Sequence, residues 1–307
     1  MIERTPKLDL FCHALLIAGI AAICLPLYYA VVAATHTLDD VLLVPMPLLP
    51  GTELITNLKA ALAKGDLGRQ LVNSLIVSIG VTTGKIAVSI LSAFAITYFR
   101  FPFRMTAFWL IFATLMLPIE VRIVPTYAVA AHPLQPLGWL LEETGLRGLV
   151  ERLSGWDVEA VVKWSLLDSY AGLILPLTAS ATATFLFRQL FLTIPEELLE
   201  AAKIDGASPM RFLVDVLWPM SRTNVVALSV ILFVFGWNQY LWPLLITTDA
   251  SMATAVIGLA KQMPGAAEAV PKWNVLMASS LLITLPPVLV VIVLQRWFVK
   301  GLVDSEK

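Results

Sequence analysis

The residues that could do chemistry in this chain are ionisable side chains placed inside long apolar stretches. Lys85, Glu120 and Arg122 each lie in a segment that is otherwise almost free of charge. A charged group in such a segment is expensive inside a membrane, so it usually faces a cavity or a partner. Two roles are therefore open. These residues could make contacts between helices, or they could line a path for a polar solute together with the amides Asn238 and Gln239.

Residue patterns for catalysis, for a metal or for a bound nucleotide are missing. The three histidines are scattered, and the sequence has no HExxH, no GxSxG and no cysteine–histidine cluster. The run Gly80–Lys85 suggests a phosphate loop, but its spacing is one residue short and neither Ser nor Thr follows the lysine. Gly80 and Gly84 are better explained as a small-residue face that lets helices approach closely. We expect no catalytic residue, metal or cofactor, so any ATP hydrolysis belongs to another subunit.

Composition indicates that these residues lie in a membrane. Hydrophobic residues make up 58% of the chain and charged residues 14%, whereas a soluble domain is nearer half apolar and a quarter charged. A net charge of −1 gives no support for a nucleic-acid partner. We predict an all-α, polytopic membrane protein, because six apolar segments are long enough to span a bilayer. They run roughly from Phe11 to Ala34, Leu71 to Tyr98, Thr106 to Val129, Ala171 to Phe191, Asn224 to Thr247 and Trp273 to Phe298.

The distribution of basic residues predicts the orientation of these spans. An even number of spans places both termini on one side. The segments on that side carry more Lys and Arg than the longer segments on the other side, which is typical of the cytoplasm. Arg4 and Lys7 precede the first span as in a signal peptide, but the span is too long to be one and we expect it to be retained. The predicted location is the bacterial cytoplasmic membrane, with both termini in the cytoplasm.

This orientation places the intramembrane polar residues at one depth. Counted from the cytoplasmic ends of their spans, Lys85, Glu120 and Asn238 each lie about 20 Å into the hydrocarbon core. Glu120 and Arg122 are two residues apart and cannot share a helix face. We therefore expect Arg122 to face away from any pair between Lys85 and Glu120. Either Lys85 and Arg122 guide an anion through this layer, or Lys85 and Glu120 form a structural pair that never meets solute.

The longest strongly polar run between two spans is Glu196–Pro219. A capping box formed by Thr193 and Glu196 predicts the start of a helix, and Gly206 can take the left-handed conformation that ends it. The pair Ser208-Pro209 suits the start of a second helix, which Pro219 is expected to close. Two short, rigidly capped helices are therefore predicted on the cytoplasmic side.

The spacing within this run resembles a known motif. Glu200-Ala201-Ala202 is followed after three residues by Gly206, and after nine more by Val216-Leu217-Trp218-Pro219. This resembles the EAA loop of ABC importer permeases, whose pattern ends in I-x-L-P, so Val and Trp replace Ile and Leu here. Stretches such as FRFPFR, LMLPIEVRIVPT, LDSYAGLILPL and GWNQYLWPLLI extend the resemblance along the chain. It is greatest to the permeases of sn-glycerol-3-phosphate importers, and the maltose-type sugar permeases are more distant.

This resemblance implies a function and a set of partners. The chain would be the transmembrane subunit of an ATP-driven importer for sn-glycerol-3-phosphate or a related glycerophosphodiester, with another sugar or oligosaccharide as the alternative. It would form a heterodimer with a homologous permease, bind a dimer of ATP-binding subunits, and receive solute from an extracytoplasmic solute-binding protein. A channel would need no EAA loop, and a membrane-embedded enzyme would need a nucleophile or metal. The residues that would couple the ATPase to the spans are Glu200, Ala201, Ala202, Asp205, Gly206 and Pro219.

The sequence shows no second domain. We expect a first helix and outer loop over residues 1–70, a core of five helices over 71–300 that contains the EAA loop (residues 193–219), and a cytoplasmic tail over 301–307. The resemblance gives no guidance for residues 132–168, where apolar residues recur at mixed helical spacing between charges. These residues fit either amphipathic helices on the outer membrane surface or a solvated loop with scattered apolar anchors.

Overall fold

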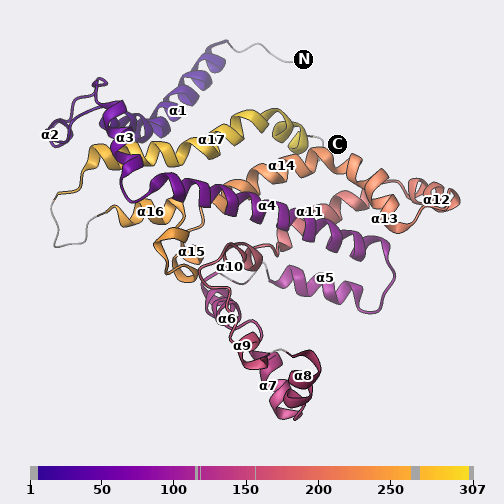
Figure 1. Cartoon of the computed structure of the whole chain (residues 1–307). Helices are drawn as coiled ribbons and strands as arrows, with labels where there is room; N and C mark the ends of the chain where they lie inside the picture. Colours follow the sequence, from indigo (N-terminus) through magenta and orange to yellow (C-terminus); the bar gives the residue numbers. More distant parts are fainter. Residues whose placement is uncertain (1–5, 115–116, 118, 156, 264–269, 304–307) are drawn as a thin grey trace. The chain divides into compact units, whose positions relative to one another are not determined.

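The structure of the chain is a computed structural model, and it confirms the expectation of an all-α protein (Figure 1). It describes every residue except 1–5, 115–116, 118, 156, 264–269 and 304–307, and the described residues contain no strand. Two 3-10 turns (Leu175–Leu177 and Ala250–Met252) and one π turn (Leu213–Leu217) join the α-helices. The α-helices are α1 (Pro6–Ala34), α2 (Leu38–Val41), α3 (Leu54–Ala63), α4 (Leu67–Tyr98), α5 (Arg104–Ala113), α6 (Ile119–Ala131), α7 (Gln135–Glu143), α8 (Arg147–Ser154), α9 (Val158–Val162), α10 (Tyr170–Ile174), α11 (Ala181–Leu192), α12 (Glu196–Ile204), α13 (Pro209–Phe212), α14 (Trp218–Trp237), α15 (Leu241–Ile246), α16 (Ala255–Lys261) and α17 (Trp273–Val303).

The expected number of six spans is not confirmed. Within the part of the chain that the structure describes, four helices are long and apolar enough to cross a membrane: Lys7–Ala34, Leu67–Tyr98, Pro209–Trp237 and Trp273–Arg296. A fifth span forms if α10 with its 3-10 extension and α11, which meet at 49°, are counted together. The span expected from Thr106 to Val129 is divided into α5 and α6, each too short to cross alone. The break between them includes residues outside the described part.

The span expected from Asn224 to Thr247 is wrong at both ends. Its helix starts at Pro209 and stops at Trp237, and α15 follows as a separate short helix. Pro219 therefore does not close the second helix of the EAA loop, which continues into the span. A proline ring normally collides with the carbonyl four residues earlier, but the π turn Leu213–Leu217 widens the helix immediately before it. Two residues farther on, the Ser221 hydroxyl donates to the Leu217 carbonyl over 2.6 Å.

The chain divides into two compact units. The first consists of Met1–Leu71 and Gly258–Pro286, and the second of Val72–Ile257 and Pro287–Lys307. These units describe packing, and the division at residue 70 into an outer segment and a five-helix core stays a prediction.

The first unit ties the end of α1 to α3 and α17 through a buried asparagine. The last carbonyls of a helix have no partner within it and need donors from elsewhere. The Asn57 side chain, on α3, donates to the carbonyls of Ala34 and His36 over 2.9 and 2.8 Å. The Asn274 amide, on α17, donates in turn to the Asn57 side-chain oxygen over 2.9 Å. This buried chain of hydrogen bonds fixes where the first span ends.

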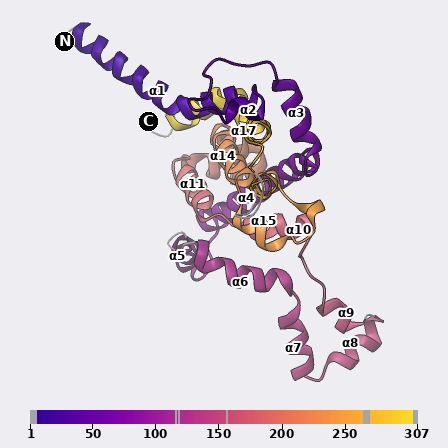
Figure 2. The ribbon, with the colours of Figure 1, turned by 90° about the vertical axis from the view of Figure 1, so that its left-hand side faces the viewer.

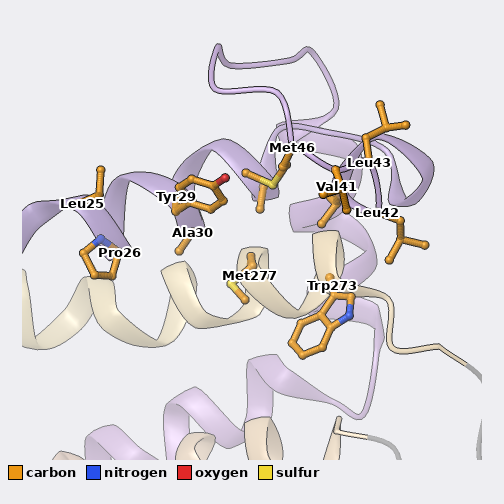
Figure 3. A pocket seen from close by; sticks show the side chains of 12 residues that line it. Leu25, Pro26, Tyr29, Ala30, Val41, Leu42, Leu43, Met46, Trp273 and Met277 are labelled. Carbon is orange, nitrogen blue, oxygen red and sulfur yellow. The ribbon is translucent and has the colours of Figure 1, made fainter.

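An apolar hollow of about 680 Å³ lies in the first unit between α1, the segment after α2 and the start of α17. Figure 3 shows its lining, which includes Tyr29 on α1, Met46 in the segment after α2, and Trp273 and Met277 on α17. All of its lining residues are apolar or aromatic. The hollow therefore offers apolar contact and no charged group.

The second unit is held together by two apolar cores. In the first core, α4, α11 and α14 lie side by side, and their buried residues include Phe94, Phe187 and Leu232 (Figures 1 and 2). The second core packs α10 and α15 against α4, and the indole N–H of Trp242 donates to the Gly172 carbonyl over 3.0 Å. These two cores position the EAA loop at one end of the unit and the polar residues of α4 between the helices.

The expected helices of the outer segment are present as α7, α8 and α9, which lie beyond α6 in Figures 1 and 2. One guanidinium joins all three. Arg147 donates to Glu142, Glu151 and Glu159 over 3.1, 3.1 and 3.2 Å. The position of these helices on a membrane surface stays a prediction.

Candidate functional site

The EAA loop is built as two helices joined by a tight, fully bonded turn. Gly206 has a φ of 70°, as its place at the end of α12 predicted. The Gly206 N–H donates to the Lys203 carbonyl over 3.1 Å, and the Ala207 N–H donates to the Ala202 carbonyl over 2.9 Å. These two bonds form a Schellman motif, which satisfies carbonyls that the end of a helix leaves open. The EAA residue Ala202 is therefore part of the turn itself.

The starts of the two loop helices agree only in part with the sequence prediction. The Ser208 hydroxyl caps α13 by accepting the Arg211 N–H over 3.3 Å, with Pro209 at the first turn, as expected. The capping box at α12 was wrong, because Pro195 occupies the cap position and the Thr193 hydroxyl donates backwards to the Leu190 carbonyl over 2.7 Å. A threonine at the end of α11 can satisfy that helix instead of the next one.

Buried side chains fix the EAA loop to the spans. Phe212 and Leu217, from the second half of the loop, lie in the core formed with α4 and α11, and Ala202 packs against it from α12. The Tyr98 ring, at the end of α4, meets the Phe212 ring edge-on with 5.3 Å between centroids. The Tyr98 hydroxyl donates to the Phe191 carbonyl of α11 over 3.2 Å. The loop is therefore packed directly against α4 and α11.

The opposite face of the loop is exposed. Glu200, Ala201 and Asp205 are exposed, and the Ile204 side chain is 86% exposed although it is large and apolar. The pair between Arg211 and Asp215, in the second half of the loop, is exposed as well, with 3.2 Å between the two side chains. A large apolar side chain that is exposed beside charged residues on a packed element often marks a site of contact with a partner.

The intramembrane residues meet on one side of α4. The Lys85 side chain is buried, with 7% exposed, and its ammonium lies 4.4 Å from the centroid of the Phe235 ring on α14. Arg122, on α6, is close enough for its charge to repel that of Lys85. Which way the Arg122 side chain faces relative to Lys85 stays a prediction. The side chain of Glu120 lies outside the described residues, so its pairing with Lys85 stays a prediction.

The two amides lie one turn farther along the chain from Phe235. Asn238 follows the last residue of α14 and is exposed, because the helix stops at Trp237. The Gln239 side chain folds back and donates to the Phe235 carbonyl over 3.1 Å. The structure thus places Lys85 beside Phe235, close to the end of α14. Sequence reasoning missed Phe235, since an aromatic residue in an apolar span gives no signal of its own.

The glycines of α4 have the packing role that their spacing predicted. A Cβ atom on Gly80 would lie 2.6 Å from the Ile174 side chain of α10, and one on Gly84 would lie 2.5 Å from the Thr178 side chain. Real Cβ contacts are essentially never so short, so only glycine allows this approach.

Residues 85–304, which include the EAA loop, match the family described as binding-protein-dependent transport system inner membrane component. The chain belongs to this family. It is also 50% identical to the sn-glycerol-3-phosphate transport system permease protein UgpE of Pectobacterium atrosepticum and 49% identical to UgpE of Agrobacterium fabrum. Each alignment covers 100% of both proteins. The resemblance inferred from the motifs is confirmed.

A solved structure shares the fold. It is a chain of a bacterial ABC transporter involved in the import of the acidic polysaccharide alginate, with a TM-score of 0.73 over 97% of this chain and 99% of that chain. The sequence identity is 17%, so this likeness concerns the fold alone. The architecture of this chain is that of an ABC importer permease.

Proposed function

We propose that this chain is a permease subunit of an ATP-driven importer that carries sn-glycerol-3-phosphate, or a related glycerophosphodiester, across the bacterial cytoplasmic membrane. The observation that carries the proposal is the EAA loop, whose inner face is packed into the spans while Glu200, Ala201 and Asp205 are exposed. The full-length similarity to the two UgpE proteins supports the choice of solute.

The proposed assembly contains three kinds of partner. A homologous permease completes the membrane part, a dimer of ATP-binding subunits binds the cytoplasmic loops, and an extracytoplasmic protein delivers solute. The exposed Ile204 and the exposed charges of the loop are the surface that we assign to the ATP-binding subunit. When ATP closes the dimer, the Schellman turn keeps α12 and α13 at a fixed angle, so the movement reaches α4 and α11 through Phe212 and Tyr98.

The proposed roles of the motif residues follow from this arrangement. Gly206 and Ala202 hold the turn, and Glu200, Ala201 and Asp205 lie on the exposed face that meets the ATP-binding subunit. Pro219 lies where the loop enters α14, and there it marks the start of the membrane part of a continuous helix. Both termini lie in the cytoplasm, on the side of this loop.

Replacing the native subunit in cells tests the proposal. The chain is expressed in cells that lack the corresponding permease of an sn-glycerol-3-phosphate importer but keep its other subunits, and uptake of labelled sn-glycerol-3-phosphate, a glycerophosphodiester and maltose is compared. We expect uptake of the phosphate esters and co-purification of the ATP-binding subunit. Uptake of maltose alone would contradict the solute, and a solubilised chain that never retains an ATP-binding subunit would contradict the importer.

A substitution in the motif sharpens this test. Glu200→Gln removes a charge from the exposed face of α12, and Glu197→Gln removes a similar exposed charge from the same helix outside the motif. We expect Glu200→Gln to lower uptake and retention of the ATP-binding subunit more than the matched control does. Equal effects of the two would show that the motif glutamate has no special role.

A further inference from the structure

Lys85 is a buried cation in the longest described spanning helix, and its surroundings offset only part of the cost of burial. An ammonium is strongly hydrated in water and loses that hydration inside a protein. The Phe235 ring, 4.4 Å away, supplies a cation–π contact. Such a contact is weaker than the lost hydration of a buried charge. A charged Lys85 therefore gains from any anion that reaches it.

A second cation also favours the binding of an anion. Arg122 lies on α6, within range of a charge–charge interaction with Lys85. Among the side chains that the structure describes, no carboxylate forms an ion pair with either residue. Two like charges held near each other are stabilised by one anion that lies between them. Arg122 is exposed in the isolated chain, so this position is open on one side.

The face of α4 that carries Lys85 is polar for several turns. Ser78, Thr82 and Ser89 recur at helical spacing with Lys85, and all four are buried. The hydroxyls of Ser78 and Thr82 donate to carbonyls one turn earlier, over 2.6 Å each. Polar groups inside a membrane usually face the interior of a bundle or a water-filled path. The cation site therefore lies on a polar stripe that runs along the span.

We propose that Lys85 and Arg122, beside the ring of Phe235, form an anion site within the spans that takes the phosphate group of the passing solute. The ammonium supplies a compact charge, and the guanidinium can hold two phosphate oxygens at once. Monoesters and diesters of phosphate both present such oxygens. The Gln239 amide, one turn from Phe235, is placed to contact the glycerol part of the solute. This inference rests on the proposed function and deepens it.

The complete importer, reconstituted in vesicles with its partner subunits and solute-binding protein, provides the test. Uptake of labelled sn-glycerol-3-phosphate is measured for the wild type, Lys85→Met, Lys85→Arg and Arg122→Gln. The matched control is Arg69→Gln, which removes an exposed charge near the start of the same helix. The phospholipid of the vesicles is the same in every sample. A difference between variants that appears only when solute is added therefore concerns the phosphate of the solute and not that of a lipid headgroup.

We expect Lys85→Met and Arg122→Gln each to lower uptake about tenfold or more, the cost of one lost bond to a charged group. Lys85→Arg should recover most of the uptake, and Arg69→Gln should leave it unchanged. ATP hydrolysis in the absence of solute should stay at the wild-type level, because the EAA loop is untouched. Wild-type uptake by an assembled Lys85→Met importer would overturn the anion site. A wild-type importer that takes up no phosphate ester would instead overturn the proposed function.

A structural pair between Lys85 and Glu120 is distinguished by a double substitution. The amounts of assembled importer and the uptake are compared for Lys85→Met, Glu120→Gln and the two together. If both single variants fail to assemble and the double variant assembles and transports normally, the residues form a structural pair and the anion site is wrong. If the double variant assembles but still transports poorly, Lys85 contributes through solute, as proposed.

Discussion

Replacing Gly206 by valine should separate transport from membrane insertion. Its φ is 70°, a conformation that costs a residue with a side chain about 1–3 kcal/mol, and most for a β-branched one. A Cβ atom there would meet no heavy atom within 4 Å, so the cost arises from the backbone alone. An energy of this size shifts the equilibrium between the capped and the uncapped turn about 5–150-fold. Because two hydrogen bonds of the Schellman motif depend on this turn, α12 should lose its fixed angle to α13.

Gly155 provides a matched control for this strain. It has a φ of 69° at the end of α8, and a Cβ atom there would also meet nothing within 4 Å. Gly155→Val therefore carries a similar backbone cost at a site far along the chain from the EAA loop. The amount of protein in the membrane, solute uptake and solute-stimulated ATP hydrolysis are measured for both variants.

We expect Gly206→Val to reach the membrane at normal levels, to lose most of its uptake and to lose the stimulation of ATP hydrolysis by solute. Gly155→Val should keep all three properties. Wild-type uptake by correctly inserted Gly206→Val would refute the reasoning that a rigid turn transmits the movement. Equal loss of uptake in both variants would show that general destabilisation is the cause.

Three further predictions concern other parts of the chain. A reporter that is active only outside the cytoplasm should be silent when fused after Lys307, and a strong signal would contradict the predicted orientation. Hydrogen bonds from the side chain of Thr248 and from the neighbouring backbone hold the pKa of Asp168 below its usual value of 3.8. The stability that this carboxylate adds is present above that value and lost as pH falls through the lower, folded-state pKa, so Asp168→Asn should flatten the response of thermal unfolding to acid below about pH 4. Gly84→Leu should lower the thermal stability, because its side chain would occupy the place of Thr178, and an unchanged unfolding temperature would contradict close packing there.

Local chemistry was enough to predict most of the turn in the EAA loop. Gly206 and the Ser208 cap follow from rules that involve only a few neighbouring residues, and the structure shows both. The same rules failed at Thr193, where two helices compete for one hydroxyl. The Thr193 hydroxyl could cap α12 or donate to the end of α11, and only the angle between these two helices decides which it does.

The spans were predicted less well, because their limits depend on packing. Pro219 normally ends a helix, and the sequence gives no sign of the π turn that lets the helix continue through it. The third span was also expected as one helix, since most of its residues are apolar, yet α5 and α6 are separate. Hydropathy records the preference of a segment for the membrane but does not record where its helix bends.

The polar residues that were expected at one depth in the membrane show the same limit of sequence analysis. Depth along a helix follows from counting, and Lys85 contacts Phe235, three residues before Asn238, which was expected at the same depth as Lys85. Direction around a helix requires its rotation as well, which packing against other helices determines. For this reason the direction of Arg122 relative to Lys85 stays a prediction. A cation that is buried beside an aromatic ring keeps only part of the stabilisation that water gave it, so it favours a bound anion, and this is why we propose solute passage rather than helix packing for Lys85.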